Sequence, residues 1–150
     1  MENKSQSSVE YLVIIALTLG IIVPTTYLFF NYGSETNVRI IDAQINQIGR
    51  SMIDTAENVY YSGESSKIIL LLNMPDNVRN AFIINNRELV LNVTTVLGEN
   101  EAVFFSAVNI TSSSCANSIC SLSDIASVGS QKVKFESVSN GKQVLISKSG

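Results

Sequence analysis

The first sixty residues of the chain carry two hydrophobic patterns of different kinds. Residues 11–30 are almost all apolar, and no charged residue lies between Glu10 and Glu35. As an α-helix, the stretch from Tyr11 to Tyr32 would be about 33 Å long, which is enough to cross the hydrocarbon core of a bilayer. The sequence therefore predicts a membrane-spanning helix near the N-terminus.

The second pattern, over residues 38–60, is amphipathic. Its apolar residues recur every three or four positions, which places them on one face of a helix. Ser62-Gly63 follows as a helix stop signal. We therefore predict one continuous helix from Ser8 to Tyr61, about 80 Å long, whose second half packs its stripe on the rest of the chain. The stripe consists of Val38, Ile41, Ile45, Ile48, Met52, Ala56 and Val59, and the opposite face carries Asp42, Gln44, Asn46, Arg50, Asp54 and Glu57.

From Lys67 onward the pattern changes to short runs typical of β-strands. Asn85-Asn86 and Asn140-Gly141 lie between such runs and predict hairpin turns. Residues 111–131 are rich in serine and are predicted to form a long surface loop, with a short helix near 122–128. The predicted fold class is α+β, with a long N-terminal helix packed against a small antiparallel β-sheet head. The expected strands are 67–73, 81–84, 87–93, 102–110, 132–137 and 143–147.

Composition agrees with one small domain joined to a membrane segment. Of the 150 residues, 45% are hydrophobic and 15% are charged, and the mean hydropathy is +0.23, which is rather apolar for a soluble protein. The net charge is −3 and the lysines and arginines are scattered, so the basic stripe of a nucleic-acid-binding protein is missing. The chain has no histidine and no recognisable nucleophile–base–acid set. We therefore expect neither an enzyme nor a bound metal or cofactor.

Two cysteines and two glycosylation motifs lie in the predicted head. Cys115 and Cys120 do not have the spacing of a CxxC redox motif, and two ligands alone do not make a zinc site. They form either a small disulfide loop, if the head is extracellular, or two free thiols. Asn92 and Asn109 begin N-x-T motifs, and such motifs are no more frequent here than chance predicts. Glycosylation is therefore expected only if the head lies outside the cell.

Three residues stand out in the apolar segment. A carboxylate in the hydrocarbon region costs roughly 3 kcal/mol or more, so Glu10 needs a partner unless it lies at headgroup level with Lys4 or water. Gly20 and Pro24 weaken the helix, and they permit either a kink in lipid or a locally unwound stretch in a polymer. An ordinary secretory signal peptide fits poorly, because the apolar run is too long and no A-x-A site follows it.

Residues 4–11, with the sequence KSQSSVEY, resemble the leader of archaeal type IV pilins, which carry a class III signal peptide. The resemblance is close over the leader and the apolar helix, and loose over the rest of the chain. It implies that a prepilin peptidase cleaves between Ser5 and Gln6, so that Gln6 becomes the N-terminus and Glu10 the fifth mature residue. The implied divisions are a leader (1–5), a transmembrane and polymerisation helix (6–32), an amphipathic helix (33–63) and an extracellular β-rich head (64–150).

The resemblance also implies a function. The chain would be a structural subunit of an adhesive surface filament, in which Glu10 neutralises the amine of Gln6 in a neighbouring subunit and Tyr11, Gly20 and Pro24 take part in assembly. Its partners would be copies of itself, other pilins, the prepilin peptidase, the assembly platform with its ATPase, and the membrane, with the N-terminus cytoplasmic before assembly. The alternatives are a minor pilin or pseudopilin of a secretion or uptake machine, and a single-pass surface anchor that never polymerises.

Overall fold

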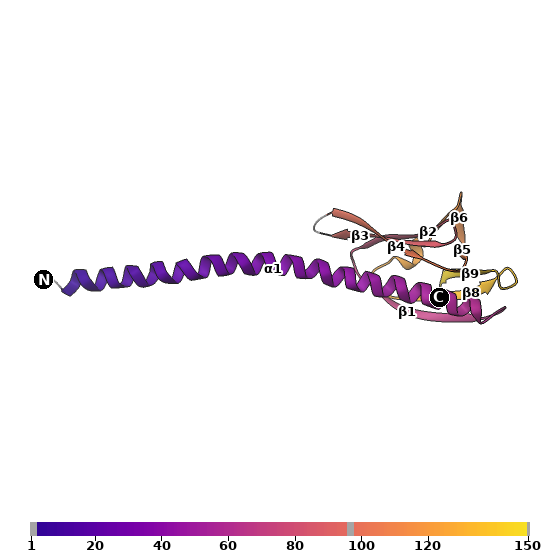
Figure 1. The fold of residues 1–150 in the computed structure, drawn as a ribbon, viewed down its shortest axis with the longest axis horizontal. Helices are drawn as coiled ribbons and strands as arrows, with labels where there is room; N and C mark the ends of the chain where they lie inside the picture. Colours follow the sequence, from indigo (N-terminus) through magenta and orange to yellow (C-terminus); the bar gives the residue numbers. More distant parts are fainter. Residues whose placement is uncertain (1–2, 96–97, 150) are drawn as a thin grey trace. The chain divides into compact units, whose positions relative to one another are not determined.

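The computed structural model describes residues 3–95 and 98–149, except for the side chains of residues 3–8 and 33–38. The chain forms two compact units, Met1–Arg39 and Ile40–Gly150, and each is described by itself. Figure 1 shows one long helix followed by strands that form the head. The elements are α1 (Asn3–Tyr61), β1 (Lys67–Met74), β2 (Val78–Ile84), β3 (Glu88–Thr95), β4 (Gly98–Phe105), β5 (Ile110–Ser112), β6 (Ser114–Ala116), β7 (Ile119–Ser121), the 3-10 helix η1 (Ser123–Ile125), β8 (Gly129–Val138) and β9 (Gln143–Lys148).

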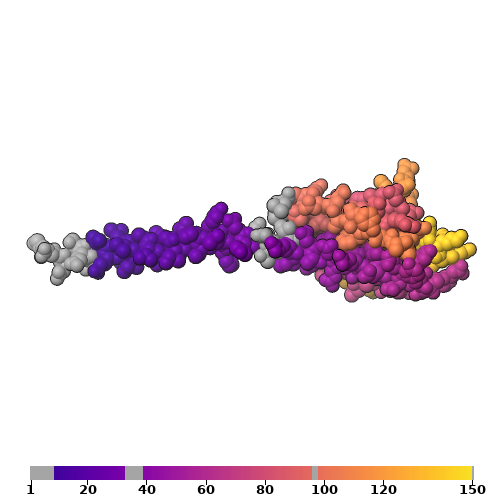
Figure 2. Space-filling model, in the orientation of Figure 1, coloured from indigo at the N-terminus to yellow at the C-terminus, as the bar shows by residue number. Residues whose placement is uncertain are grey.

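Helix α1 ends where the sequence predicts. The amide of Ser62 donates to the carbonyl of Asn58 at 3.0 Å, and the amide of Gly63 donates to the carbonyl of Tyr60 at 3.2 Å. Gly63 has a φ of +91°, a left-handed conformation that glycine adopts without a side-chain clash. The helix continues through Pro24 without interruption. In Figure 2, its second-unit part, purple to magenta, is visible at the surface of the head beside orange residues.

The head contains two sheets. The first has the strand order β1-β8-β9-β5, and the second has the order β4-β3-β2-β7-β6. All pairings are antiparallel except β5 with β9, which is parallel. The prediction of an α+β fold with antiparallel sheets is confirmed at this level, but a single sheet is wrong. The alternating apolar residues of both sheets bury their inner faces against a shared core.

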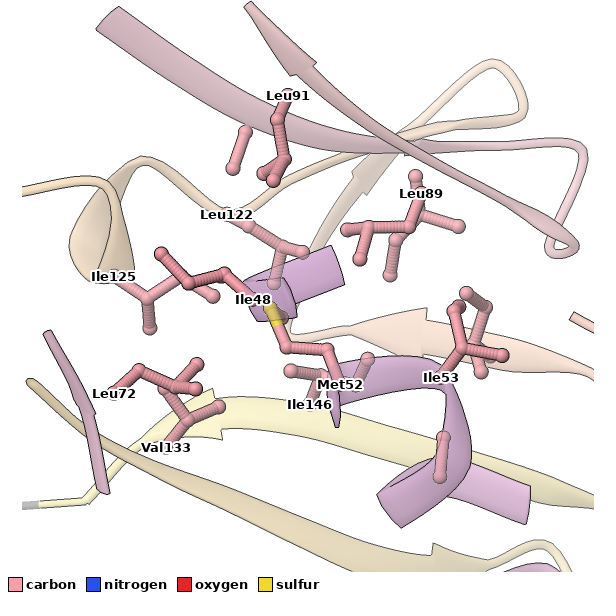
Figure 3. Packing of buried hydrophobic residues seen from close by; sticks show 14 of the residues in the cluster. Ile48, Met52, Ile53, Leu72, Leu89, Leu91, Leu122, Ile125, Val133 and Ile146 are labelled. Atoms are coloured by element: carbon pink, nitrogen blue, oxygen red, sulfur yellow. The ribbon is translucent and has the colours of Figure 1, made fainter. Parts of the chain in front are cut away.

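The predicted helical stripe forms one side of this core. Figure 3 shows Met52 of α1 between Leu89 and Leu91 of one sheet and Val133 and Ile146 of the other. Met52 is 0% exposed, so it contacts protein on all sides. The predicted stripe residues Ile45, Ile48, Met52, Ala56 and Val59 are buried and Ile41 is partly buried, whereas the side chain of Val38 lies outside the described residues.

Both predicted hairpins are confirmed. Asn85 and Asn86 have positive φ values of 52° and 59°, and the amide of Arg87 donates to the carbonyl of Ile84 at 3.1 Å. These are the left-handed conformations that a tight hairpin turn requires, and asparagine tolerates them better than most residues. Asn140 and Gly141 likewise have positive φ values and connect β8 to β9.

The predicted strand 102–110 is wrong in both its limits. Strand β4 begins earlier, at Gly98, and ends at Phe105, while Ile110 starts the separate strand β5. The intervening backbone crosses from one sheet to the other, and different elements satisfy its amides. The amide of Ser106 donates to the carbonyl of Arg87 at 2.8 Å, and that of Ala107 to a carboxylate oxygen of Glu57 in α1 at 3.0 Å. An apolar run alone does not reveal such a crossing.

The interpretation of 111–131 as a loop is also wrong. Strands β6 and β7 form a small hairpin that adds to the edge of β2, and the predicted short helix is only the 3-10 turn η1. Leu122 and Ile125 are buried in the core. The serine-rich composition suggested a loop, but β-bridges and a few buried apolar residues tie this segment to the head.

One glycine in α1 is explained by packing. A side chain added to Gly49 would overlap the ring of Phe104 in β4, so the strand can approach the helix only where the Cβ is missing. We expect Gly49→Val to lower the free energy of unfolding by about 1–3 kcal/mol, because overpacking displaces that ring. Denaturant unfolding of the full chain in detergent measures this. In a Phe104→Ala background the same substitution should have little effect; an equal loss there would contradict the explanation.

Candidate functional site

The first unit is an apolar helix without cover. Residues Val9–Tyr32 form a 24-residue segment with a mean hydropathy of 2.3, long and apolar enough to cross a membrane, and the apolar stretch is 0% buried. Phe29 and Phe30, for example, are 79% and 74% exposed. Exposing this many large apolar side chains to water is strongly unfavourable, so the segment requires a lipid or protein environment.

The hydroxyls of Thr18 and Thr25 are satisfied within the helix. The Oγ1 of Thr18 donates to the carbonyl of Ile14 at 2.6 Å, and the Oγ1 of Thr25 donates to the carbonyl of Ile21 at 2.7 Å. Such back-bonding removes the cost of placing a hydroxyl in hydrocarbon. Pro24 has no amide hydrogen, and Gly20 has a low helix propensity. The middle of the segment therefore combines a lost backbone hydrogen bond with a weak helix former.

Glu10 is the acidic residue of this apolar segment. Its side chain is exposed, as is that of Tyr11, and no described side chain pairs with Glu10. Ser5 and Gln6 lie less than two turns earlier in α1, but their side chains lie outside the described residues. The predicted set Gln6, Glu10, Tyr11, Gly20 and Pro24 therefore lies along one helix. The described part of the chain brings no second element to these residues.

The predicted disulfide is confirmed. Cys115 and Cys120 are bonded across the β6–β7 hairpin, where they occupy directly opposed positions. Cys120 is buried and Cys115 is exposed, and the Oγ1 of Thr111 lies 3.4 Å from the Sγ of Cys115. The bond closes a short loop, so its expected contribution is modest, on the order of 2 kcal/mol. Its role is to hold a small hairpin at the edge of the second sheet.

Both candidate glycosylation asparagines lie in the head and are partly buried. Asn92 is in the interior strand β3, opposite Asn80 and Glu101, on the face that points away from the core. Asn109 lies in the crossing segment, where its carbonyl accepts the amide of Val144 at 2.9 Å. Glycosylation at these residues stays a prediction.

Among the described residues, no group of three histidine, cysteine, aspartate or glutamate side chains could hold a metal ion. A hydrogen bond and the positive charge of Lys134, 2.8 Å away, lower the pKa of Glu136, with a smaller contribution from Lys67. The carboxylate of Glu136 therefore stays ionised to lower pH than a free glutamate.

Sequence reasoning missed three features of the head. These are the burial of Ile53, the contact of Gly49 with Phe104, and the hydrogen bond from Ala107 to Glu57. Ile53 follows Met52 along the helix and widens the buried stripe. It falls outside the spacing of three and four residues that defines the predicted stripe. Glu57 was assigned to the polar face, and nothing in its sequence context indicates that a backbone amide 50 residues later reaches it.

No family model matches the chain, and no curated protein or solved structure matches it significantly. The class of the protein therefore rests on its own residues. These comprise a helix able to span a membrane, a carboxylate at its start, and a separately packed α+β head with a disulfide in its β6–β7 hairpin.

Proposed function

We propose that the chain is a structural subunit of a type IV pilus-like surface filament, assembled through its N-terminal helix after removal of residues 1–5. The observation that carries the proposal is the uncovered segment Val9–Tyr32, joined to a head that packs without it. Before assembly the segment would lie in the membrane, with the N-terminus cytoplasmic and the head extracellular. After assembly it would lie among copies of itself in the filament core.

Glu10 supports this proposal through its energetics. Moving an apolar helix from lipid to a bundle of apolar helices gains little hydrophobic energy, because both surroundings are apolar. A charge pair is far stronger in low dielectric than in water. After cleavage between Ser5 and Gln6, the free amine of Gln6 would supply the positive partner from a neighbouring subunit. The pair would also fix the axial register between subunits, even where its net energy is small.

Gly20 and Pro24 contribute differently. The lost hydrogen bond at Pro24 and the low helix propensity of Gly20 would allow the helix to unwind locally when neighbouring helices surround it. Tyr11, one position after Glu10, would lie at the level of the charge pair. Prepilin peptidase and an assembly platform with its ATPase are the partners that this route requires, and the head would mediate adhesion.

The same features suit two other functions. A minor pilin or pseudopilin would need the same leader, Glu10 and apolar helix, and it would prime or cap a filament or act in a secretion or uptake machine. A single-pass anchor that presents its head for binding would need only the apolar segment. It would keep residues 1–5 and would not depend on Glu10.

The test is the intact mass and N-terminal peptide of the protein in material sheared from the cell surface. We expect a mature chain that starts at Gln6, retains Tyr11 and the apolar segment, and keeps its disulfide. A chain that starts at Met1 and is found only in membranes would mean that the protein is a plain surface anchor. A processed chain present only in trace amounts within filaments of another subunit would indicate a minor pilin.

A further inference from the structure

We propose that the heads of successive copies join edge to edge, with β1 of one copy pairing with β4 of the next. The first sheet of one head would continue into the second sheet of its neighbour. The contact deepens the proposed filament function and rests on it for its biological role. It is nevertheless a property of the head surfaces, and it can be tested separately from leader cleavage and from Glu10.

Strand β1 is an unusually open edge. It is eight residues long and pairs with β8 on one side, and no described strand pairs with its other side. Ile69 and Leu71, on the face that points away from the core, are 53% and 65% exposed. Proteins usually protect long apolar edges with charges, prolines or bulges, because such edges readily pair with another strand. Here the regular register with β8 shows no bulge, and the single charge of β1 is Lys67 at its start.

Strand β4 is the corresponding edge of the second sheet. It also has eight residues, pairs with β3, and has no described partner on its other side. Val103 and Phe105 point away from the core and are 42% and 72% exposed. The same face carries Glu99 and Glu101. Each head therefore presents two free edges of equal length, and both have two exposed apolar side chains on the outer face.

Helix α1 lies between these two edges. A groove of about 300 Å³ separates it from β1 and is lined by the polar side chains of Gln44, Gln47 and Ser51, together with 70–73 of the strand. A second groove of about 400 Å³ separates the helix from Val103–Phe105 of β4. Part of each strand, 70–73 of β1 and Val103–Phe105 of β4, therefore borders a hollow beside the helix. An added strand forms main-chain hydrogen bonds along such an unpaired edge.

The charges around the two edges have opposite signs. Lys67 and its neighbours Lys132 and Lys134 surround β1 on the outer face, where Glu136 offsets one of them. Glu88, Glu99 and Glu101 surround β4 on its outer face. The Nε of Arg79 donates to the Oγ1 of Thr94 at 3.4 Å, and Thr94 lies opposite Glu99, so Arg79 offsets one of these charges. On the other side of β4, the groove carries Arg50 together with Asp54 and Glu57 of α1. The β1 edge is therefore basic and the β4 edge is acidic.

This difference selects the pairing. Joining β4 to β4 would place two acidic edges side by side, and joining β1 to β1 would place two basic edges side by side. Like charges in opposed positions destabilise a strand pair, whereas opposite charges stabilise it. The favoured contact is therefore β1 with β4, which uses a different surface on each copy. Such a heterologous contact leaves a free edge at each end, so it extends into a chain unless it closes into a ring.

An antiparallel register that places Ile69 of β1 opposite Val103 of β4 also gives the other outer-face residues favourable neighbours. It sets Lys67 against the aromatic ring of Phe105, a favourable arrangement for a cation. It also opposes Glu101 to Leu71, whose neighbour on β8 is Lys132. The apolar pair of Ile69 and Val103 then occupies the centre of the seam. Lys67 and Glu88 lie on either side of Phe105 at one end, and Glu101 and Lys132 lie on either side of Leu71 toward the other.

Charge exchange in the full chain tests the pairing. All four residues of the exchange, Lys67, Lys132, Glu99 and Glu101, are exposed, so the variants should fold. We expect Lys67→Glu with Lys132→Glu to reduce the yield of sheared filaments about tenfold, and Glu99→Lys with Glu101→Lys to do the same. All four changes in one chain should restore the yield. Loss without restoration would overturn the proposal. Unchanged yields would overturn it too.

Cysteine cross-linking in intact cells tests the same contact without counting filaments. One chain carrying both Ile69→Cys and Val103→Cys should give a ladder of disulfide-linked oligomers on a non-reducing gel, while either substitution alone should give monomers. Dimers from a single substitution would indicate a contact between identical edges and would overturn the proposal. If the unaltered chain forms no filaments, the proposed function fails, and the ladder still decides the edge contact. Filaments without a ladder, together with failed charge restoration, would leave the function standing and remove the edge pairing.

Discussion

Replacing Glu10 with alanine should leave the protein in the membrane with a folded head and abolish its filaments. The apolar segment keeps its length and hydropathy, so insertion should be unaffected. In the assembled state, the amine of a neighbouring Gln6 would be left without its carboxylate. An unpaired buried charge costs about 3–5 kcal/mol, which weakens each contact more than about a hundredfold.

The measurement is electron microscopy and quantification of sheared filaments, alongside the amount of protein in the membrane fraction. Asp42→Ala is the matched control, because Asp42 is an exposed acidic residue on the same helix within the second unit. It should assemble normally. Normal filaments from Glu10→Ala would contradict the role assigned to Glu10, and a protein missing from the membrane would make Glu10 a determinant of insertion.

Replacing Met52 with alanine should destabilise the head by about 2–5 kcal/mol, because it removes a side chain that fills the space between the two sheets. Met52 is 0% exposed and is among the largest fully buried side chains. Since small domains are stable by only about 5–15 kcal/mol, this loss is a large fraction of the total.

Hydrogen exchange of the full chain in detergent measures the effect. Amides of β3 and β8, which lie on opposite sides of Met52, should lose protection together (Figure 3). Gln47→Ala changes an exposed residue of the same helix and should shift stability by less than about 0.5 kcal/mol. Loss of protection confined to one sheet would mean that the helix packs independently on each sheet.

The sequence predicted the features that depend on local spacing. Periodicity predicts the helix stripe. Residues that tolerate positive φ predict the end of α1 just before Gly63 and the turns at Asn85-Asn86 and Asn140-Gly141. For Cys115 and Cys120 the sequence left a disulfide and two free thiols open, and the structure contains the disulfide. Each of these signals lies within a few residues of the structure that it specifies.

The errors concern contacts between distant segments. The division into two sheets depends on the segment after Phe105, whose amides bond to the β2–β3 turn and to Glu57. The sequence predicts a loop over 111–131, because the three-residue strands β5, β6 and β7 are too short to show alternation. In the candidate site, the sequence singled out Glu10, Gly20 and Pro24, but their proposed partners are other chains, which a single chain does not contain.

The position of α1 within the head also determines how the protein would bear mechanical load. A pull on the chain at residue 40 acts along the helix axis, and the buried residues from Ile45 to Val59 lie along about 21 Å of that axis. Their contacts with the two sheets would be loaded in shear, all at the same time, rather than peeled apart one by one. Extraction of the helix would therefore require most of the core to rupture at once, so the head should resist tension better than its equilibrium stability alone suggests.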